Sequence, residues 1–331
     1  MKTTTFYRLL VITAFTGMLF SCNKSNSSSS SSGTSSTDLQ TTSDDQTRVS
    51  TESDAAFDDV NTTMTSQASV TGSNLNPGIR HTEIEGGGGD TVKSYICDAS
   101  VSLDTTDNPH TLTITYNGTN CALDRTRTGS VVVSWTPGVR WSTAGAVVTV
   151  AFQNLAITRL SDNKTITLNG THTYTNVSGG SLLSLPNNPG TSITHTITSS
   201  NMSITFDNGA KRNWNVARQR VYSYSEGFVI TTTGTNTNGS VTGISEWGTD
   251  RFGNSFQTII AQPRVISESC SWQMTAGEVQ LSNTAGTTSI TYGLSATGTA
   301  TSCPVSGGTY YFQLSWTAAV SGKSYTFILP Y

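Results

Sequence analysis

The chain has 331 residues, of which 12% are charged and 34% are hydrophobic, and 104 of them are Ser or Thr. So small a charged fraction is not typical of coiled-coil or long helical proteins. The net charge of -3 leaves no basic excess to neutralise a phosphate backbone, which argues against nucleic acid as a partner. The composition is typical of a β-rich protein that works outside the cytoplasm.

The N-terminal residues have the pattern of an export signal. Lys2 and Arg8 are followed by an apolar run over 9–20, which is too short to span a bilayer. The run leads into Leu19-Phe20-Ser21-Cys22, the pattern of a lipobox. We therefore predict a signal peptide over 1–21 and a diacylglyceryl group on Cys22, which makes the membrane a partner through a lipid anchor. An ordinary signal peptide beside a chance cysteine is the alternative.

Residues 22–92 are predicted to be a Ser/Thr-rich tether, because few of its side chains can bury apolar surface. One short amphipathic helix is expected over 50–69, where Ala56, Val60 and Met64 recur at four-residue spacing. The alternative is that this segment also stays coil, since threonine is a poor helix former. Gly86 to Gly89 are expected to form a hinge before the folded part.

Residues 93–331 are predicted to form one antiparallel β domain. Runs of β-branched residues bounded by Asn, Gly and Pro predict about fourteen short strands, with no segment of convincing helical periodicity. Asn-Gly pairs at Asn208-Gly209 and Asn238-Gly239 suit hairpin turns. The fold class is therefore all-β, an antiparallel meander forming two curved sheets, sandwich-like or a partly closed barrel.

A string from Ile114-Thr-Tyr116 to Trp135 is echoed from Ile290-Thr-Tyr292 to Trp316. Two repeats within the domain explain it, and convergence of Thr-rich strands explains it equally well.

Four cysteines besides Cys22 are expected to form disulfides in an exported chain. We predict the pairs Cys97 with Cys121 and Cys270 with Cys303, because each pair brackets a predicted hairpin. Each bond should stabilise the fold by roughly 3 kcal/mol. A metal site is not expected, since no C-x-x-C and no suitably spaced histidine is present.

The lipobox with its Ser-rich tether, the run Asp124 to Gly129 before a Val-rich strand, and Cys270-Ser271-Trp272 resemble a group of uncharacterised lipoproteins of Bacteroidota. The resemblance covers most of residues 95–331 and implies an all-β lipoprotein of the cell envelope, with no reaction attached. The residues after the cysteine, Asn23-Lys24-Ser25, lack the acidic pair expected for surface export in those bacteria. An outer-membrane lipoprotein is thus expected, on either the periplasmic or the surface face.

No catalytic residues and no cofactor are predicted. His81, His110, His172 and His195 are scattered, and no nucleophile motif is present. His172 and His195 are expected to be half-exposed strand residues. Glu226, Glu246, Asp250 and Glu268 are the acids from which a glycosidase pair would have to come, with a separation of roughly 5 to 9 Å; surface solubilising roles are favoured.

The best candidate for ligand binding is the run Glu246 to Arg251, where Trp247 stands beside the hydrogen-bonding groups of Glu246, Asp250 and Arg251. Sugars stack on such rings. Trp141 is a second candidate, although packing is the commoner role for both tryptophans. The basic strand Lys211 to Arg220 is expected to leave the core, with an anionic glycan or lipid headgroup as a possible ligand.

We therefore expect a lipid-anchored envelope protein with a non-catalytic binding or structural β domain, and glycan or peptidoglycan as the candidate ligand. The alternatives are a glycan-acting enzyme and an outer-membrane β-barrel, the latter because Tyr325, Phe327, Leu329 and Tyr331 alternate up to the end of the chain.

Overall fold

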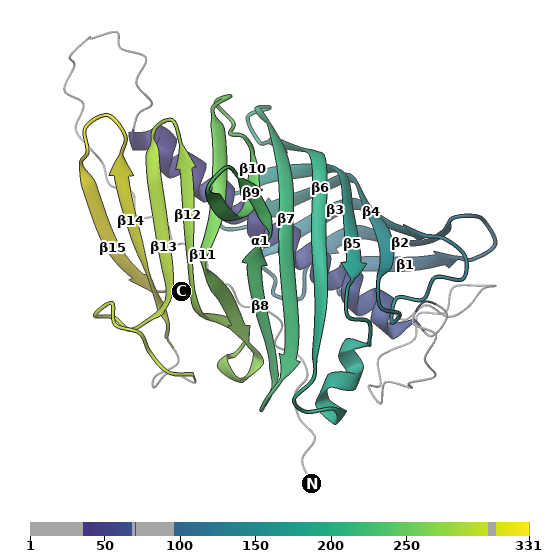
Figure 1. The fold of residues 1–331 in the computed structure, drawn as a ribbon. Helices are drawn as coiled ribbons and strands as arrows, with labels where there is room; N and C mark the ends of the chain where they lie inside the picture. Colours follow the sequence, from purple (N-terminus) through teal and green to yellow (C-terminus); the bar gives the residue numbers. More distant parts are fainter. Residues whose placement is uncertain (1–35, 68–69, 71–95, 304–308, 331) are drawn as a thin grey trace.

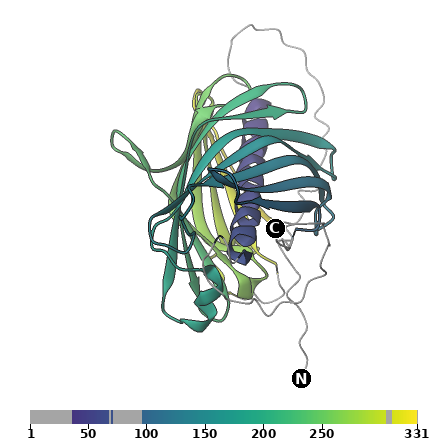
Figure 2. The ribbon, with the colours of Figure 1, turned by 90° about the vertical axis from the view of Figure 1, so that its right-hand side faces the viewer.

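The computed structural model describes residues 36–67, 70, 96–303 and 309–330. They form one 15-stranded antiparallel sheet that curves around one long helix, α1 (Figures 1 and 2). The all-β antiparallel prediction is confirmed. The strands belong to a single sheet and not to two, because the concave face is covered by α1 instead of by a second sheet (Figure 2).

The helices are α1 (Ser36–Ser66) and the short 3-10 segments η1 (Leu182–Asn187) and η2 (Glu268–Cys270). The strands are β1 (Ala99–Asp104), β2 (His110–Thr119), β3 (Arg125–Trp135), β4 (Ala146–Arg159), β5 (Lys164–Asn176), β6 (Ser192–Phe206), β7 (Lys211–Tyr224), β8 (Phe228–Gly234), β9 (Asn236–Asn238), β10 (Val241–Thr249), β11 (Ser255–Ser267), β12 (Gln273–Asn283), β13 (Gly286–Leu294), β14 (Tyr311–Ala318) and β15 (Ser324–Pro330).

Strand order follows chain order except around β7. The first half of β7 pairs with β10, and its second half pairs with β8, which also pairs with β11. β8 and β10 thus lie one below the other between β7 and β11 (Figure 1). β1 and β15 are the two edge strands.

Alternation of side chains sets which face of the sheet meets α1. In β4, Ala146, Val148, Val150 and Phe152 are buried, and the residues between them are more exposed. The alternation shifts where β3 and β4 bulge, at Gly129. Gly129 has φ of +99°, and a Cβ there would lie 2.1 Å from the Asn154 carbonyl oxygen. Only glycine therefore fits this bulge, which helps the sheet to curve.

The predicted helix over 50–69 is present up to Ser66 as part of a longer helix, α1, which has 31 residues against the 20 predicted and begins at Ser36. The prediction that this part of 22–92 is a tether was wrong for residues 36–66, because Phe57, Val60 and Met64 are buried in the core of the sheet. Thirteen of the 31 residues of α1 are Ser or Thr, which are weak helix formers. Contacts with the sheet therefore stabilise a helix that its own sequence disfavours.

The structure has fifteen strands, against about fourteen expected from the sequence. β11 runs without a break through bulges near Gln262, and the chain leaves the sheet at η2 before β12 begins. The two strings that resemble each other form the hairpins β2–β3 and β13–β14.

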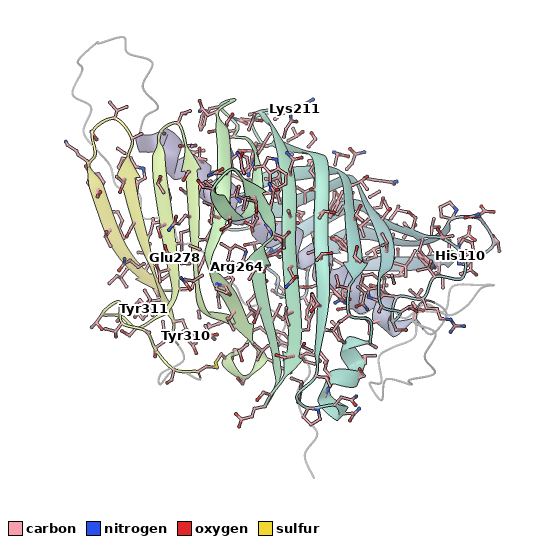
Figure 3. The ribbon with its side chains drawn as sticks, viewed as in Figure 1. His110, Lys211, Arg264, Glu278, Tyr310 and Tyr311 are labelled. Carbon is pink, nitrogen blue, oxygen red and sulfur yellow. A yellow bond between two sulfur atoms is a disulfide. The ribbon has the colours of Figure 1, made fainter. Side chains whose placement is uncertain are left out.

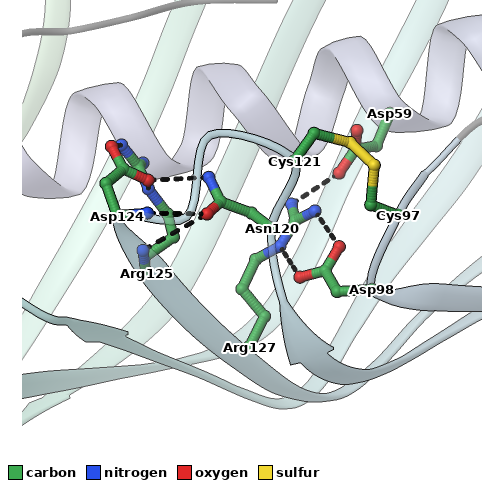
Figure 4. The surroundings of a disulfide bond; sticks show 8 residues. All are labelled: Asp59, Cys97, Asp98, Asn120, Cys121, Asp124, Arg125 and Arg127. Carbon is green, nitrogen blue, oxygen red and sulfur yellow. Dashed lines mark hydrogen bonds and ion pairs between the residues drawn. A yellow bond between two sulfur atoms is a disulfide. The ribbon is translucent and has the colours of Figure 1, made fainter.

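Both predicted disulfides are confirmed. Cys97 pairs with Cys121 and Cys270 pairs with Cys303. The first bond ties the segment before β1 to the β2–β3 turn and lies beside Asp59 of α1 (Figure 4).

Within the described ranges, no helix has both the length and the apolar composition needed to cross a bilayer. The predicted signal peptide, Cys22, the tether up to residue 35, His81 and Gly86 to Gly89 lie outside the described residues.

Candidate functional site between helix and sheet

The concave face of the sheet carries eight arginines that contact α1. Seven of the 31 residues of α1 are acidic, and its one basic residue is Arg48. The ion pairs join Asp44 with Arg159, Asp45 with Arg251, Glu52 with Arg125, Asp54 with Arg218, Arg220 and Arg264, Asp58 with Arg220, and Asp59 with Arg127. The eighth arginine, Arg212, donates to the side chain of Gln46. The helix therefore supplies the counter-charges for the interior of the sheet.

Asp54 is the centre of this network. Its carboxylate lies 2.5 Å from Arg218, 2.8 Å from Arg220 and 3.2 Å from Arg264. Burial opposes its ionisation, but the three guanidinium groups outweigh burial and lower the pKa of Asp54 to about 2. An ionised carboxylate with three cations around it holds the helix to the sheet through ion pairs, and it is not a proton donor or acceptor near neutral pH.

A second cluster joins the end of α1 to the first disulfide. Arg127 donates to both oxygens of Asp98 at 2.6 and 2.7 Å and to Asp59 at 2.6 Å (Figure 4). Tyr116 donates to the same Asp59 oxygen at 2.9 Å. Burial, and next the charge of Asp59, raise the pKa of Tyr116 well above its usual range. The phenol therefore stays protonated as a hydrogen-bond donor.

The sequence placed Glu246 in a ligand-binding loop, and the structure places it inside the protein. Glu246 belongs to β10 and is 1% exposed. It accepts hydrogen bonds from the Trp214 indole at 2.8 Å and from Ser50 at 3.1 Å. Gln46 and Arg218 are further partners. The prediction of an accessible carboxylate was wrong because one face of β10 turns toward α1.

Asp250 and Arg251 also have internal partners. Asp250 accepts from the backbone amides of Phe252 and Asn254, so it shapes the turn after β10. Arg251 binds Asp45 at 2.5 Å and stacks over the Phe206 ring at 4.1 Å. Both side chains therefore act in folding, and neither is free for the predicted ligand.

The two candidate tryptophans have different surroundings. Trp141 is 3% exposed, and its indole donates to Asn61 of α1 at 3.4 Å, so it is a core residue and not a sugar platform. Trp247 lies half-buried on the opposite face of β10 from Glu246. Its register partners are Asn215 of β7 and Gln257 of β11.

The histidines are not half-exposed as predicted. His172 and His195 are 0% and 1% exposed, and aromatic rings surround both. Burial, with the nearby Arg218 for His172 and Arg220 for His195, lowers the pKa of each to about 3. His110 is at the end of the sheet far from Tyr310 and Tyr311 (Figure 3). His172 and His195 are on the neighbouring strands β5 and β6, but their register partners are Ser199 and Asn176, so the two do not face each other.

The four acids considered for a glycosidase pair fall into two groups, with Glu246 and Asp250 toward one end of the strands and Glu226 and Glu268 toward the other. Glu246 pairs in register with Val216, whereas Glu226 lies in the turn after Tyr224. Val216 and Tyr224 are eight residues apart along β7, or roughly 25 Å at about 3.3 Å per residue. Glu268 lies near the Tyr224 end of β7 as well, where it accepts a hydrogen bond from the backbone amide of Phe228. Asp250 follows Glu246 by four residues, or roughly 13 Å.

A cavity of about 70 Å³ lies between α1 and the sheet, lined among others by Gln46, Ser50, Thr258 and Thr288. It has room for a few water molecules and is far smaller than the roughly 300 Å³ of the smallest usual ligand sites. Among the described residues, no group of three or more His, Cys, Asp or Glu is arranged to hold a metal ion.

The basic character of β7 was recognised in the sequence, but the burial of its arginine side chains was not predicted. Arg212, Arg218 and Arg220 point into the core and are 1 to 2% exposed, so the expectation that β7 runs out of the core was wrong. The acids of α1 were not predicted to be the partners of these arginines. Charge complementarity could have indicated the pairing, because a strongly acidic segment and a strand with alternating arginines occur in one chain.

Comparison with protein-family models, curated proteins and solved structures gave no match to this chain.

Proposed function

We propose that this protein is a lipid-anchored lipoprotein of the bacterial outer membrane, whose helix-filled β sheet is a non-catalytic module for binding or structure. The anchor is supported by the lipobox pattern that ends at Cys22. The resemblance to envelope lipoproteins of Bacteroidota supports the same compartment. A membrane is therefore the first partner of the proposal.

One observation carries the non-catalytic part. The acids of α1 neutralise the arginines of the concave face, and the cavity described between helix and sheet has a volume of about 70 Å³. A sugar or peptide would need several times that volume. In this arrangement, partners are expected to bind the outer surfaces of the domain. A glycan-acting enzyme is the weaker alternative, because Glu246, Asp250 and Glu268 accept hydrogen bonds from internal partners.

The lipid anchor is tested by metabolic labelling of cells with a palmitate analogue. The wild-type chain should take up the label and fractionate with the outer membrane, and the Cys22→Ala variant should do neither. Labelling of the variant would contradict the proposal. Protease added to intact cells, with a periplasmic protein as control, then distinguishes a surface location from a periplasmic one.

Glycan or peptidoglycan binding is a second candidate function, and Trp247 on the convex face favours it. An aromatic ring with Gln257 beside it in register combines a stacking surface with a hydrogen-bonding group, and the Asn215 amide donates to the Trp247 backbone carbonyl at 3.3 Å. Trp247→Ala should reduce recovery in glycan and peptidoglycan pull-downs, whereas Trp272→Ala, which removes a ring stacked on Phe228, should not. Equal recovery of both variants and the wild type would exclude this site.

A further inference from the structure

One corner of the sheet concentrates exposed apolar side chains. Nine large hydrophobic residues of the described chain are exposed, and four of them, Phe252, Val320, Tyr325 and Phe327, lie here with exposures of 46%, 94%, 46% and 53%. We call this region the anchor-side corner and define it as the turns 250–254, 284–285 and 319–323 together with Tyr325 and Phe327 of β15.

Hydrogen bonds join the three turns of the anchor-side corner into one surface. The Asn283 amide reaches Asp250 at 3.5 Å, which links the first turn to the second. The backbone amide of Ala319 donates to the Ala285 carbonyl at 2.9 Å, which links the second turn to the third. Val320 and Phe252 are therefore on turns at the same end of the strands, with the turn 284–285 between them.

Tyr325 and Phe327 are exposed on the concave side of the edge strand β15. Ser43 of α1 contacts Thr288 of β13 at 3.2 Å, and Thr288 pairs in register with Trp316 of β14. Trp316 stacks on Tyr325 with ring centroids 5.3 Å apart. Tyr325 and Phe327 thus lie on the same side of the sheet as α1.

The N-terminal part of α1 lies at the same corner. Asp45 binds Arg251 of the first turn at 2.5 Å, and the start of the helix is seen behind the upper ends of β13 and β14 (Figure 1). Thirteen residues lie between Cys22 and Ser36, so the two residues are at most about 50 Å apart when the chain is fully extended. A lipid at Cys22 therefore keeps the membrane within reach of this corner.

The exposed charge within the three turns is a lysine. Lys323 is exposed, Arg251 is paired with Asp45 and lies 4.0 Å from Asp207, and the one acid among the three turns, Asp250, is 2% exposed. Apolar and aromatic groups next to a lysine are typical of surfaces that enter the headgroup region.

We propose that the anchor-side corner is a membrane-contact surface, which inserts Val320, Phe252, Tyr325 and Phe327 into the headgroup region of the bilayer that holds the anchor. This inference rests on the proposed lipid anchor. It orients the domain with α1 pointing its N-terminal end at the membrane, and it leaves the convex face around Trp247 accessible to other partners.

The test uses the full mature chain with Cys22→Ser, purified without acyl chains, so that binding does not depend on the anchor. Vesicles of phosphatidylethanolamine and phosphatidylglycerol are floated through a density gradient with this protein. It should float with the vesicles, and Val320→Asp should lower the partition coefficient about ten-fold, because it replaces an inserted apolar group by a charge. Phe327→Ser, a second variant at an exposed site, should lower it as well.

Val177→Asp is the matched control, since Val177 is also exposed, at 47%, and lies after β5 at the opposite end of the strands from the anchor-side corner. It should bind as the parent chain does. No flotation of the parent chain, or equal loss in the Val177 and Val320 variants, would overturn the inference. A dimer that Val320→Asp dissociates, without vesicle binding, would overturn it in favour of a second copy of the chain. Failure of acylation at Cys22 in cells would instead refute the proposed anchor and leave the vesicle result unchanged.

Discussion

Asp54 of α1 and Arg220 of β7 form an ion pair of 2.8 Å in the interior of the protein. The two residues are far apart in the sequence, and Arg218 and Arg264 bind the same carboxylate. This carboxylate is the main point at which a helix of low intrinsic stability is fixed to the sheet.

Asp54→Asn should lower the free energy of unfolding by about 3 to 5 kcal/mol, because it leaves buried guanidinium groups without their counter-charge. Urea unfolding followed by tryptophan fluorescence measures the change. The matched control is Asp162→Asn, which breaks the more exposed pair with Arg159 and should cost no more than about 1 kcal/mol. Equal effects of the two variants would contradict a central role for Asp54.

The low pKa of Asp54 predicts that the free energy of unfolding depends on pH in the acid range. The folded-state pKa of Asp54 is about 2, below the usual value of about 3.9 in an unfolded chain. The stabilisation that the ionised Asp54 carboxylate gives to the folded state is therefore complete above pH 4 and is lost as the pH falls through 2. The difference in unfolding free energy between wild type and Asp54→Asn should shrink over that window, as urea titrations at pH 5, 4 and 3 would show.

Phe57→Ala should destabilise the protein by about 3 to 5 kcal/mol. Phe57 is 1% exposed, its ring is 4.5 Å from that of Tyr174, and Arg220 lies over it at 4.7 Å. Leu123→Ala, at a residue 73% exposed, should change stability by less than about 0.5 kcal/mol. If thermal and urea unfolding of Phe57→Ala matched the wild type, α1 would not be part of the folded core.

The two buried histidines should make the protein less stable as the pH falls from 6.5 toward 3. Their folded-state pKa values are about 3, so in that window the unfolded chain binds protons that the folded chain excludes. At pH 5, each histidine should lower the unfolding free energy by about 2 kcal/mol relative to pH 8. His195→Phe should remove its share of this slope. An unchanged slope would mean that His195 accepts a proton in the folded protein.

Replacing Cys97 and Cys121 together by Ser should cost about 3 kcal/mol, because the bond closes a loop of 24 residues. Peptide mapping without reductant should recover Cys97 linked to Cys121 and Cys270 linked to Cys303. Any link between the two pairs would contradict both the sequence prediction and the structure.

The sequence by itself determined the antiparallel strands and both disulfides. These features depend on residues close together in the chain: β-branched runs such as Ser130 to Trp135, turns such as Asn208-Gly209, and cysteines that bracket single hairpins. Local periodicity and spacing carry that information directly.

Only the tertiary structure decided that there is one sheet, that α1 fills it, and that Glu246, Asp250 and Arg251 are internal. The contacts responsible join residues as far apart as Asp54 and Arg218, 164 positions along the chain. The Ser/Thr-rich sequence of α1 predicts coil or at most a short helix, and it becomes a long helix because the arginine-lined face binds its acids and buries Phe57 and Val60. The acidic pattern of α1 and the basic pattern of the strands were visible in the sequence. Which acid pairs with which arginine follows from the curvature of the whole sheet.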